Sequence, residues 1–389
     1  MNKYTVDKIG SALSPLNPSK QVSVVDWNDS PRAGDVVVVR ALSESVTYGN
    51  LELPSGRLAK INRNDILLGV LGKRRALKGF VGDVPESVST GDRLHLLNMG
   101  GLIGVCKGHH SSLSDAIEVE VLGNAIDCRM RNEDRGLDHP EGNVQISGSE
   151  STRKPKVLNI ADSALRPTDL LNHGAPLVVV AGTCMNSGKT VAVTEIIKQA
   201  NHAGLRVAGA KMSGVAALRD TLNMQDHGAI ATASFLDCGL PSTVDCADLA
   251  MVAKAILNHL NTFEPDLIVV ELGDGIVGGY SVESVLADPE IQNAVSSFVF
   301  CASDYVGVVG GVTILKELGI NVDVIAGSVT DSQMGEDFVQ SQYGISAGNV
   351  RRDGRRLFEL VTSAEAENVG DAITKITGEW SGTLRVPAV

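Results

Sequence analysis

The chain has 389 residues, of which 43% are apolar and 21% charged, and its formal net charge is −12. This length allows two or three domains, and the composition is ordinary for a globular protein. The acidic balance and an aromatic content of only 4% argue against a nucleic-acid partner. Phosphate backbones attract basic surfaces, and single strands stack on aromatic rings.

The N-terminal twenty residues lack the apolar core of a signal peptide, and no apolar run approaches the roughly 20 residues that span a bilayer. The six cysteines include no Cys-x-x-Cys pair. We therefore expect a cytoplasmic protein with reduced thiols and no membrane partner. One short basic run, Lys73-Arg74-Arg75, is interpreted as a solvated turn.

Short β-rich runs fill the first part of the chain. Between residues 21 and about 130, segments such as "GDVVVVRALS" and "AIEVEVLG" recur with Gly-Asp turn signals between them. This spacing is typical of a small barrel or sandwich. We therefore predict an all-β domain over residues 1–135. The polar segment that follows, rich in Gly and Pro, predicts a linker over 136–175.

The pattern changes at residue 176. Buried apolar runs such as "PLVVVAG" and "PDLIVVELGDG" alternate with longer amphipathic segments such as "ADLAMVAKAILNHLNTF". This alternation predicts βαβ units, and hence a doubly wound, mostly parallel sheet with helices on both faces. We assign this α/β domain to residues 176–380.

The first of these units carries a candidate phosphate-binding loop, "GTCMNSGKT", between an apolar strand and a good helix. Backbone N–H groups of such a loop can point at phosphate oxygens, and the helix N-terminus adds positive charge. Lys189 would reach the β- and γ-phosphates, and the Thr190 hydroxyl would face Mg²⁺. The candidate nucleotide-binding residues are Gly182, Thr183, Asn186, Ser187, Gly188, Lys189, Thr190 and Val191.

Five residues, rather than the usual four, separate Gly182 from the Gly188-Lys189 pair. This variant resembles the loop of dethiobiotin synthetase and its relatives in the SIMIBI group of P-loop NTPases, which includes cobyrinic acid amidases and the MinD/ParA class. In these proteins the loop reads Gly-Thr, four variable residues, then Gly-Lys-Thr. The resemblance covers roughly residues 176–330.

Three further blocks support the resemblance. It implies that Lys211, in "RVAGAKMSG", follows the second strand and reaches the substrate, so that Lys189 and Lys211 are the candidate catalytic residues. It also implies a Mg²⁺ site made by Thr190, Asp226 and Glu271. In this set Asp226 of "NMQDHGAIA" is the natural match, and Asp220 is the weaker one.

The resemblance implies an enzyme that uses ATP and Mg²⁺ to transfer a γ-phosphoryl group to a small-molecule acceptor, such as a carboxylate or carbamate. Dethiobiotin synthetase itself is not expected, because that family lacks an N-terminal β domain and has Pro-Val where this chain has Met212-Ser213. ATP is preferred to GTP because the late strand is not followed by Asn-Lys-x-Asp. The resemblance also allows a homodimer.

Two other functions stay open at this stage. One is a nucleotide-switched, partner-binding ATPase or GTPase of the same group, or a metallochaperone. The absence of a Cys/His cluster counts against its metal-carrying form. The other is a nucleoside or polynucleotide kinase, against which the net charge of −12 counts.

Overall fold

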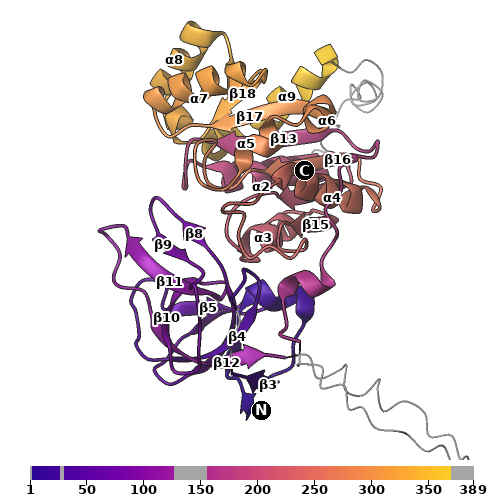
Figure 1. Ribbon diagram of the computed structural model, residues 1–389. Helices are drawn as coiled ribbons and strands as arrows, with labels where there is room; N and C mark the ends of the chain where they lie inside the picture. Colours follow the sequence, from indigo (N-terminus) through magenta and orange to yellow (C-terminus); the bar gives the residue numbers. More distant parts are fainter. Residues whose placement is uncertain (1, 27–29, 127–155, 369–389) are drawn as a thin grey trace, which may run out of the picture.

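The computed structural model describes residues 2–26, 30–126 and 156–368. An all-β part lies below an α/β part in Figure 1, and β8 and β9 rise from the first toward the second. The first half of the predicted linker, residues 136–155, lies outside the described ranges. The predicted domain limit at residue 135 falls there as well, and it stays a prediction.

The all-β part is built from short strands joined by turns, with two short 3₁₀ helices, η1 (Ser11–Leu16) and η2 (Ile160–Ser163). Residues 157–159 return to it through isolated bridges to Ile126 and Asp35. Its strands are β1 (Asn2–Thr5), β2 (Lys8–Ile9), β3 (Gln21–Val25), β4 (Val36–Ala41), β5 (Asn50–Glu52), β6 (Leu58–Lys60), β7 (Ile66–Leu71), β8 (Arg74–Arg75), β9 (Phe80–Asp83), β10 (Arg93–Asn98), β11 (Leu102–His109) and β12 (Glu118–Ala125).

Five of these strands close into a ring, in which β4 pairs with β7, β7 with β11, β11 with β10, β10 with β12, and β12 again with β4. The predicted barrel or sandwich is therefore a barrel. Alternate side chains of each strand point to one face of a sheet, and here that face is the interior. The apolar side chains buried together there include Val37, Val39, Leu67, Leu96, Ile103 and Val121.

The α/β part contains a seven-stranded sheet of order β15-β14-β16-β13-β17-β18-β19, and every described pairing in it is parallel. The predicted doubly wound sheet is thus confirmed. The strands are β13 (Leu177–Gly182), β14 (Val207–Lys211), β15 (Ala231–Ser234), β16 (Leu267–Glu271), β17 (Val295–Cys301), β18 (Val324–Ala326) and β19 (Ser346–Ala347).

Helices cover both faces of this sheet, because parallel strands are joined by crossovers. The helices are α2 (Lys189–His202), α3 (Arg219–Asp226), α4 (Leu249–Asn261), α5 (Val282–Leu286), α6 (Pro289–Ala294), α7 (Tyr305–Glu317), α8 (Gln333–Tyr343) and α9 (Val350–Asn368), with the short 3₁₀ helix η3 (Ser328–Asp331) before α8. Buried side chains of α2, α3 and α9 pack with one face of the strands, and those of α4 to α8 pack with the other. None of the described helices combines the length and apolar character needed to cross a membrane.

The two parts are joined by buried polar contacts. The Glu52 carboxylate, at the end of β5, accepts a hydrogen bond from the Leu218 N–H at 2.7 Å, directly before α3. It also accepts one from the Ser11 hydroxyl. Asn98, at the end of β10, donates its side-chain N–H to the Ala216 carbonyl at 3.0 Å. The β domain therefore contacts the segment between β14 and α3, which leads into the candidate site.

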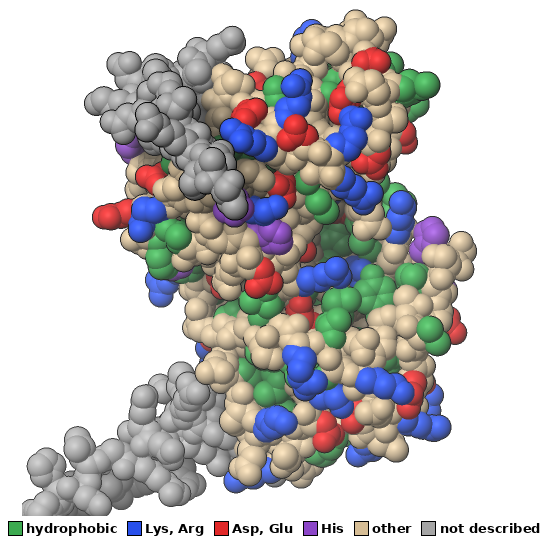
Figure 2. Space-filling model, turned by 180° about the vertical axis from the view of Figure 1, so that it is seen from behind, with side chains coloured by type: hydrophobic (Ala, Val, Ile, Leu, Met, Phe, Trp, Pro, Cys, Tyr) green, Lys and Arg blue, Asp and Glu red, His purple; other side chains and the backbone are tan. Residues whose placement is uncertain are grey.

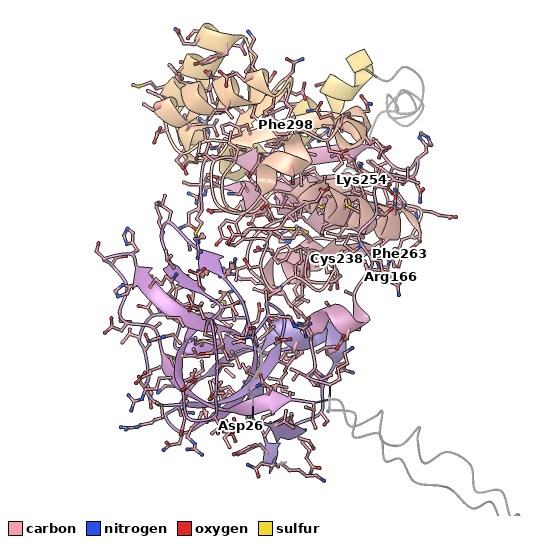
Figure 3. All side chains as sticks on the ribbon, viewed as in Figure 1. Asp26, Arg166, Cys238, Lys254, Phe263 and Phe298 are labelled. Atoms are coloured by element: carbon pink, nitrogen blue, oxygen red, sulfur yellow. The ribbon has the colours of Figure 1, made fainter. Side chains whose placement is uncertain are left out.

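Phe298 and Lys254, both labelled in Figure 3, belong to the α/β part. Phe298 lies on β17 in the sheet, and Lys254 lies on α4 beside it. The Lys254 ammonium is 2.8 Å from carboxylate oxygens of both Asp288 and Glu290, so it ties α4 to the start of α6. This arrangement joins two of the helices that pack on the same face of the sheet.

Candidate functional site

The candidate phosphate loop has the expected strand-loop-helix setting, between the end of β13 at Gly182 and the start of α2 at Lys189. Gly188 precedes the helix with φ of 105°, a conformation that L side chains rarely adopt. A Cβ atom added at Gly182 would lie 2.5 Å from the Ser187 hydroxyl and 2.6 Å from the Cys301 carbonyl oxygen. Glycine is thus required at both ends of the loop. With this loop and this sheet, the domain has the fold of a P-loop NTPase.

The loop borders a pocket of about 590 Å³ between the α/β part and the β domain. In Figure 2 the molecule is hollowed between its two parts, with Lys and Arg side chains near the hollow. Among the predicted nucleotide-binding residues, the pocket is lined by Asn186, Gly188, Lys189, Thr190 and Val191. The other three form the support of the loop rather than its lining: Gly182, Thr183 and Ser187.

Lys189 is almost fully buried at the edge of this pocket. Its ammonium donates hydrogen bonds to the Cys184 carbonyl at 2.8 Å and to the Asp274 carbonyl. Burial lowers the pKa of Lys189, and the charge of Lys211 adds to the effect, while the charge of Glu271 opposes it. A phosphate group would offset the cost of this desolvation, because it would give the buried ammonium a negatively charged partner.

Behind the loop, Lys211 and Glu271 lie side by side on the neighbouring strands β14 and β16. The Lys211 ammonium is 2.6 Å from Glu271 Oε1 and 2.8 Å from Asp220 Oδ2. Burial lowers the pKa of Lys211, but the two carboxylates outweigh it, so the pKa is raised. The Lys211 charge in turn lowers the pKa of Asp220. These side chains form a buried charged cluster at the carboxyl edge of the sheet, where ligands of open α/β sheets bind.

The oxygen atoms at this edge fit a Mg²⁺ ion. Thr190 Oγ1 donates to Glu271 Oε1 at 3.0 Å, so the two predicted ligands are in contact. Glu271 Oε2 is buried and has no hydrogen-bond partner in the described structure. Mg²⁺ prefers hard oxygen ligands and usually keeps several waters and phosphate oxygens. Thr190 and Glu271 supply oxygen donors of this kind. The described residues contain no group of three or more His, Cys, Asp or Glu side chains placed to hold a metal.

The third predicted Mg²⁺ ligand, Asp226, is not brought to this cluster. It is the last residue of α3, is exposed and does not line the pocket. Asp220, in the first turn of the same helix, lines the pocket and pairs with Lys211. Six residues of α-helix separate the two by about 9 Å along the axis. The carboxylate at the site is therefore that of Asp220, which the sequence pattern had ranked second.

Sequence reasoning missed the wall opposite the phosphate loop. The β domain supplies the side chains of Tyr48, Arg74, Asn98 and Met99 to the same pocket. They lie in or beside short strands that carry no motif, and only their three-dimensional docking reveals them. Arg74, interpreted from the sequence as part of a solvated turn, is 4% exposed. The segments after β18 and β19 also line the pocket, through Gly327, Ser328, Asp331, Asn349, Val350 and Arg351.

Comparisons with known proteins find likeness in structure but not in sequence. No protein-family model matches the chain, and no curated protein sequence matches it. The chain is similar to the solved structure of the signal recognition particle receptor FtsY from Elizabethkingia anophelis, at 13% identity and a TM-score of 0.35, over 49% of this chain and 66% of that one.

Two other solved structures resemble it to a similar degree. One is the Signal Recognition Particle 54 kDa protein from Aeropyrum pernix K1 in complex with GDP, at 14% identity and a TM-score of 0.35, over 54% of each chain. The other is a DUF1611 family protein from Anabaena variabilis, at 11% identity and a TM-score of 0.37, over 51% of this chain and 63% of that one. This chain covers less than two thirds of each of the three proteins. At these scores the likeness adds nothing to what the loop and the sheet show directly.

Proposed function

We propose that this protein is an ATP- and Mg²⁺-dependent enzyme that transfers the γ-phosphoryl group of ATP to a small carboxylate or carbamate acceptor. The observation that carries the proposal is that Lys189, Thr190, Lys211 and Glu271 line one pocket, at the carboxyl edge of a parallel sheet. This is the set of groups that positions and neutralises a transferring phosphoryl group. The pocket has the volume of small-ligand sites in general.

The nucleotide would lie along the phosphate loop, with its base toward the segments at Gly327 and Asn349 and its γ-phosphate toward Lys211. An acceptor oxygen attacks the γ-phosphorus, the bond to the bridging β,γ-oxygen breaks, and ADP leaves with that electron pair. Lys189 neutralises the charge that develops on the phosphate oxygens. Thr190, and Glu271 directly or through water, would hold Mg²⁺, which would supply electrostatic stabilisation of the phosphates. An acyl phosphate formed in this way is open to capture by an amine.

The experiment compares nucleotide binding and phosphate release by the full chain and two variants. Lys189→Ala should lower the rate of phosphoryl transfer or hydrolysis by about 10²–10³-fold, because it removes the charge at the phosphates. Lys198→Ala is the matched control, since Lys198 is on the same helix, pairs with Glu195 and does not line the pocket. Equal rates for wild type and Lys189→Ala would refute the assignment. If the protein binds GTP more tightly than ATP, the proposed nucleotide is GTP instead of ATP.

One observation favours a second function, that of a partner-driven nucleotide switch. The Lys211 ammonium is held by two carboxylates, which is an arrangement suited to fixing a strand end as well as to binding an acceptor. The two functions differ in what stimulates turnover. Phosphate release that rises with small carboxylic acids supports the enzyme, and release that rises only with a protein partner supports the switch.

A further inference from the structure

Arg74 belongs to the β domain, and its positively charged side chain lines the candidate active site. The residues on both sides of it are fixed to the α/β part. The Lys73 ammonium is 2.7 Å from Asp245 Oδ2, and the Arg75 N–H donates to the Tyr280 hydroxyl at 3.1 Å. Two contacts across the domain boundary therefore hold β8 in place, and Arg74 between them lines the pocket that also contains Lys189.

The guanidinium of Arg74 is buried but incompletely satisfied. It lies 4.9 Å from the centre of the Tyr48 ring, donates to the Tyr48 hydroxyl at 2.9 Å and donates to the Leu97 carbonyl. Its Nε atom is buried without a hydrogen-bond partner in the described structure. None of the ion pairs among the described residues involves Arg74. A buried guanidinium held only by neutral oxygens is costly unless an anion compensates its charge.

The positive charge of Arg74 acts on the carboxyl group of Asp274 within the site. Its carboxyl, in the turn after β16, has a pKa raised by burial, and the charges of Lys189, Lys211 and Arg74 each oppose that rise. Asp274 thus lies in the field of all three cations, two from the phosphate side and one from the β domain. Lys211 is offset by Asp220 and Glu271, whereas none of the ion pairs among the described residues involves Lys189 or Arg74, so these two cations can each attract an anion that enters the pocket.

We propose that the β domain provides the acceptor-binding wall of the pocket, and that Arg74 binds a carboxylate of the acceptor that is not the group being phosphorylated. The planar fork of an arginine matches a carboxylate through two parallel hydrogen bonds, and the Tyr48 ring holds the fork in one orientation. Asn98, at the end of β10, adds an amide at the same wall. The substrate class is therefore a small dicarboxylic acid or an N-carboxylated acid. The transfer of phosphate to this acceptor rests on the proposed function, whereas the binding of a carboxylate by Arg74 does not.

The test measures anion binding by titration calorimetry on the full chain, without nucleotide and with a non-hydrolysable ATP analogue plus Mg²⁺. The probes are malonate, succinate and glutarate, with acetate and inorganic phosphate as comparisons. Wild type should bind at least one dicarboxylate more tightly than acetate, and Arg74→Gln should weaken that binding at least tenfold. The Kd of the ATP analogue should change less than twofold. Arg75→Gln is the matched control, because Arg75 pairs with Asp83 and does not line the pocket.

Three results would overturn the proposal: no dicarboxylate binding by wild type, equal dicarboxylate binding by Arg74→Gln, or an equal loss in Arg75→Gln. If wild type binds phosphate more tightly than every dicarboxylate, and Arg74→Gln loses that phosphate binding, the proposed carboxylate ligand is wrong and the acceptor carries a phosphate group. If Arg74→Gln does not fold, Arg74→Lys keeps the charge without the fork, and dicarboxylate binding should still weaken several-fold. Lys189→Ala separates this inference from the proposed function. Loss of ATP-analogue binding there, with dicarboxylate binding retained, supports both.

Discussion

Replacing Lys211 by methionine tests whether the charged cluster at the sheet edge stabilises the fold through its pairing. The side chain of Lys211 is 13% exposed, and those of its partners Glu271 and Asp220 are 2% and 32% exposed. Removing one partner of a buried ion pair costs roughly 3–5 kcal/mol, because the remaining charge has no compensation. Solvent screens Asp220, which is one third exposed, so we expect about 3 kcal/mol.

The double variant Lys211→Met/Glu271→Gln should recover at least half of this loss, because it leaves no isolated buried carboxylate on β16. The assay is urea unfolding of the full chain, followed by circular dichroism. The difference between wild type and Lys211→Met should also depend on pH. The lowered pKa of Asp220 means that its contribution is present above roughly pH 4 and lost as pH falls through the folded-state value.

The raised pKa of Lys211 has the opposite sign, so its contribution is present below roughly pH 10 and lost only as pH rises through the folded-state value. The stability difference should therefore be constant between roughly pH 5 and pH 9 and shrink in acid. A loss below about 1 kcal/mol for Lys211→Met, or a double variant no more stable than the single one, would refute the reasoning.

Two further predictions follow from the site. Asp220→Asn should lower both the rate of phosphoryl transfer and the free energy of unfolding, because Asp220 pairs with Lys211. Asp226→Asn, at the exposed end of α3, should change neither quantity. Turnover and unfolding assays run in parallel would contradict the structure if the two variants had equal effects. Burial raises the pKa of the Cys301 thiol to about 12, so iodoacetamide at pH 8 should leave it unmodified in the native protein. Cys184, in the partly exposed phosphate loop, should react and be protected by ATP; mass spectrometry of the labelled peptides would show the opposite if the loop does not bind nucleotide.

The parts of the site that could be predicted from sequence are those whose geometry is local. Gly182, Gly188, Lys189 and Thr190 lie within nine consecutive residues, and the strand before them and the helix after them fix their conformation. Lys211 and Glu271 could also be placed, because each ends an apolar run that reads as a strand. The carboxyl ends of parallel strands meet at one edge of a sheet. The choice between Asp220 and Asp226 could not be made in this way, because it depends on which end of α3 faces the pocket.

The amino-acid sequence by itself determined a parallel α/β domain with a phosphate loop, preceded by a β-rich domain, since hydrophobic periodicity and turn residues are set by near neighbours. Only the tertiary structure decided which end of α3 faces the pocket and that Arg74 and Tyr48 face it from the other side. More than one hundred residues separate Arg74 from Lys189, and their approach depends on how the barrel docks through Glu52, Lys73 and Asn98. Such docking arises from the complementarity of two folded surfaces, which no short stretch of sequence encodes.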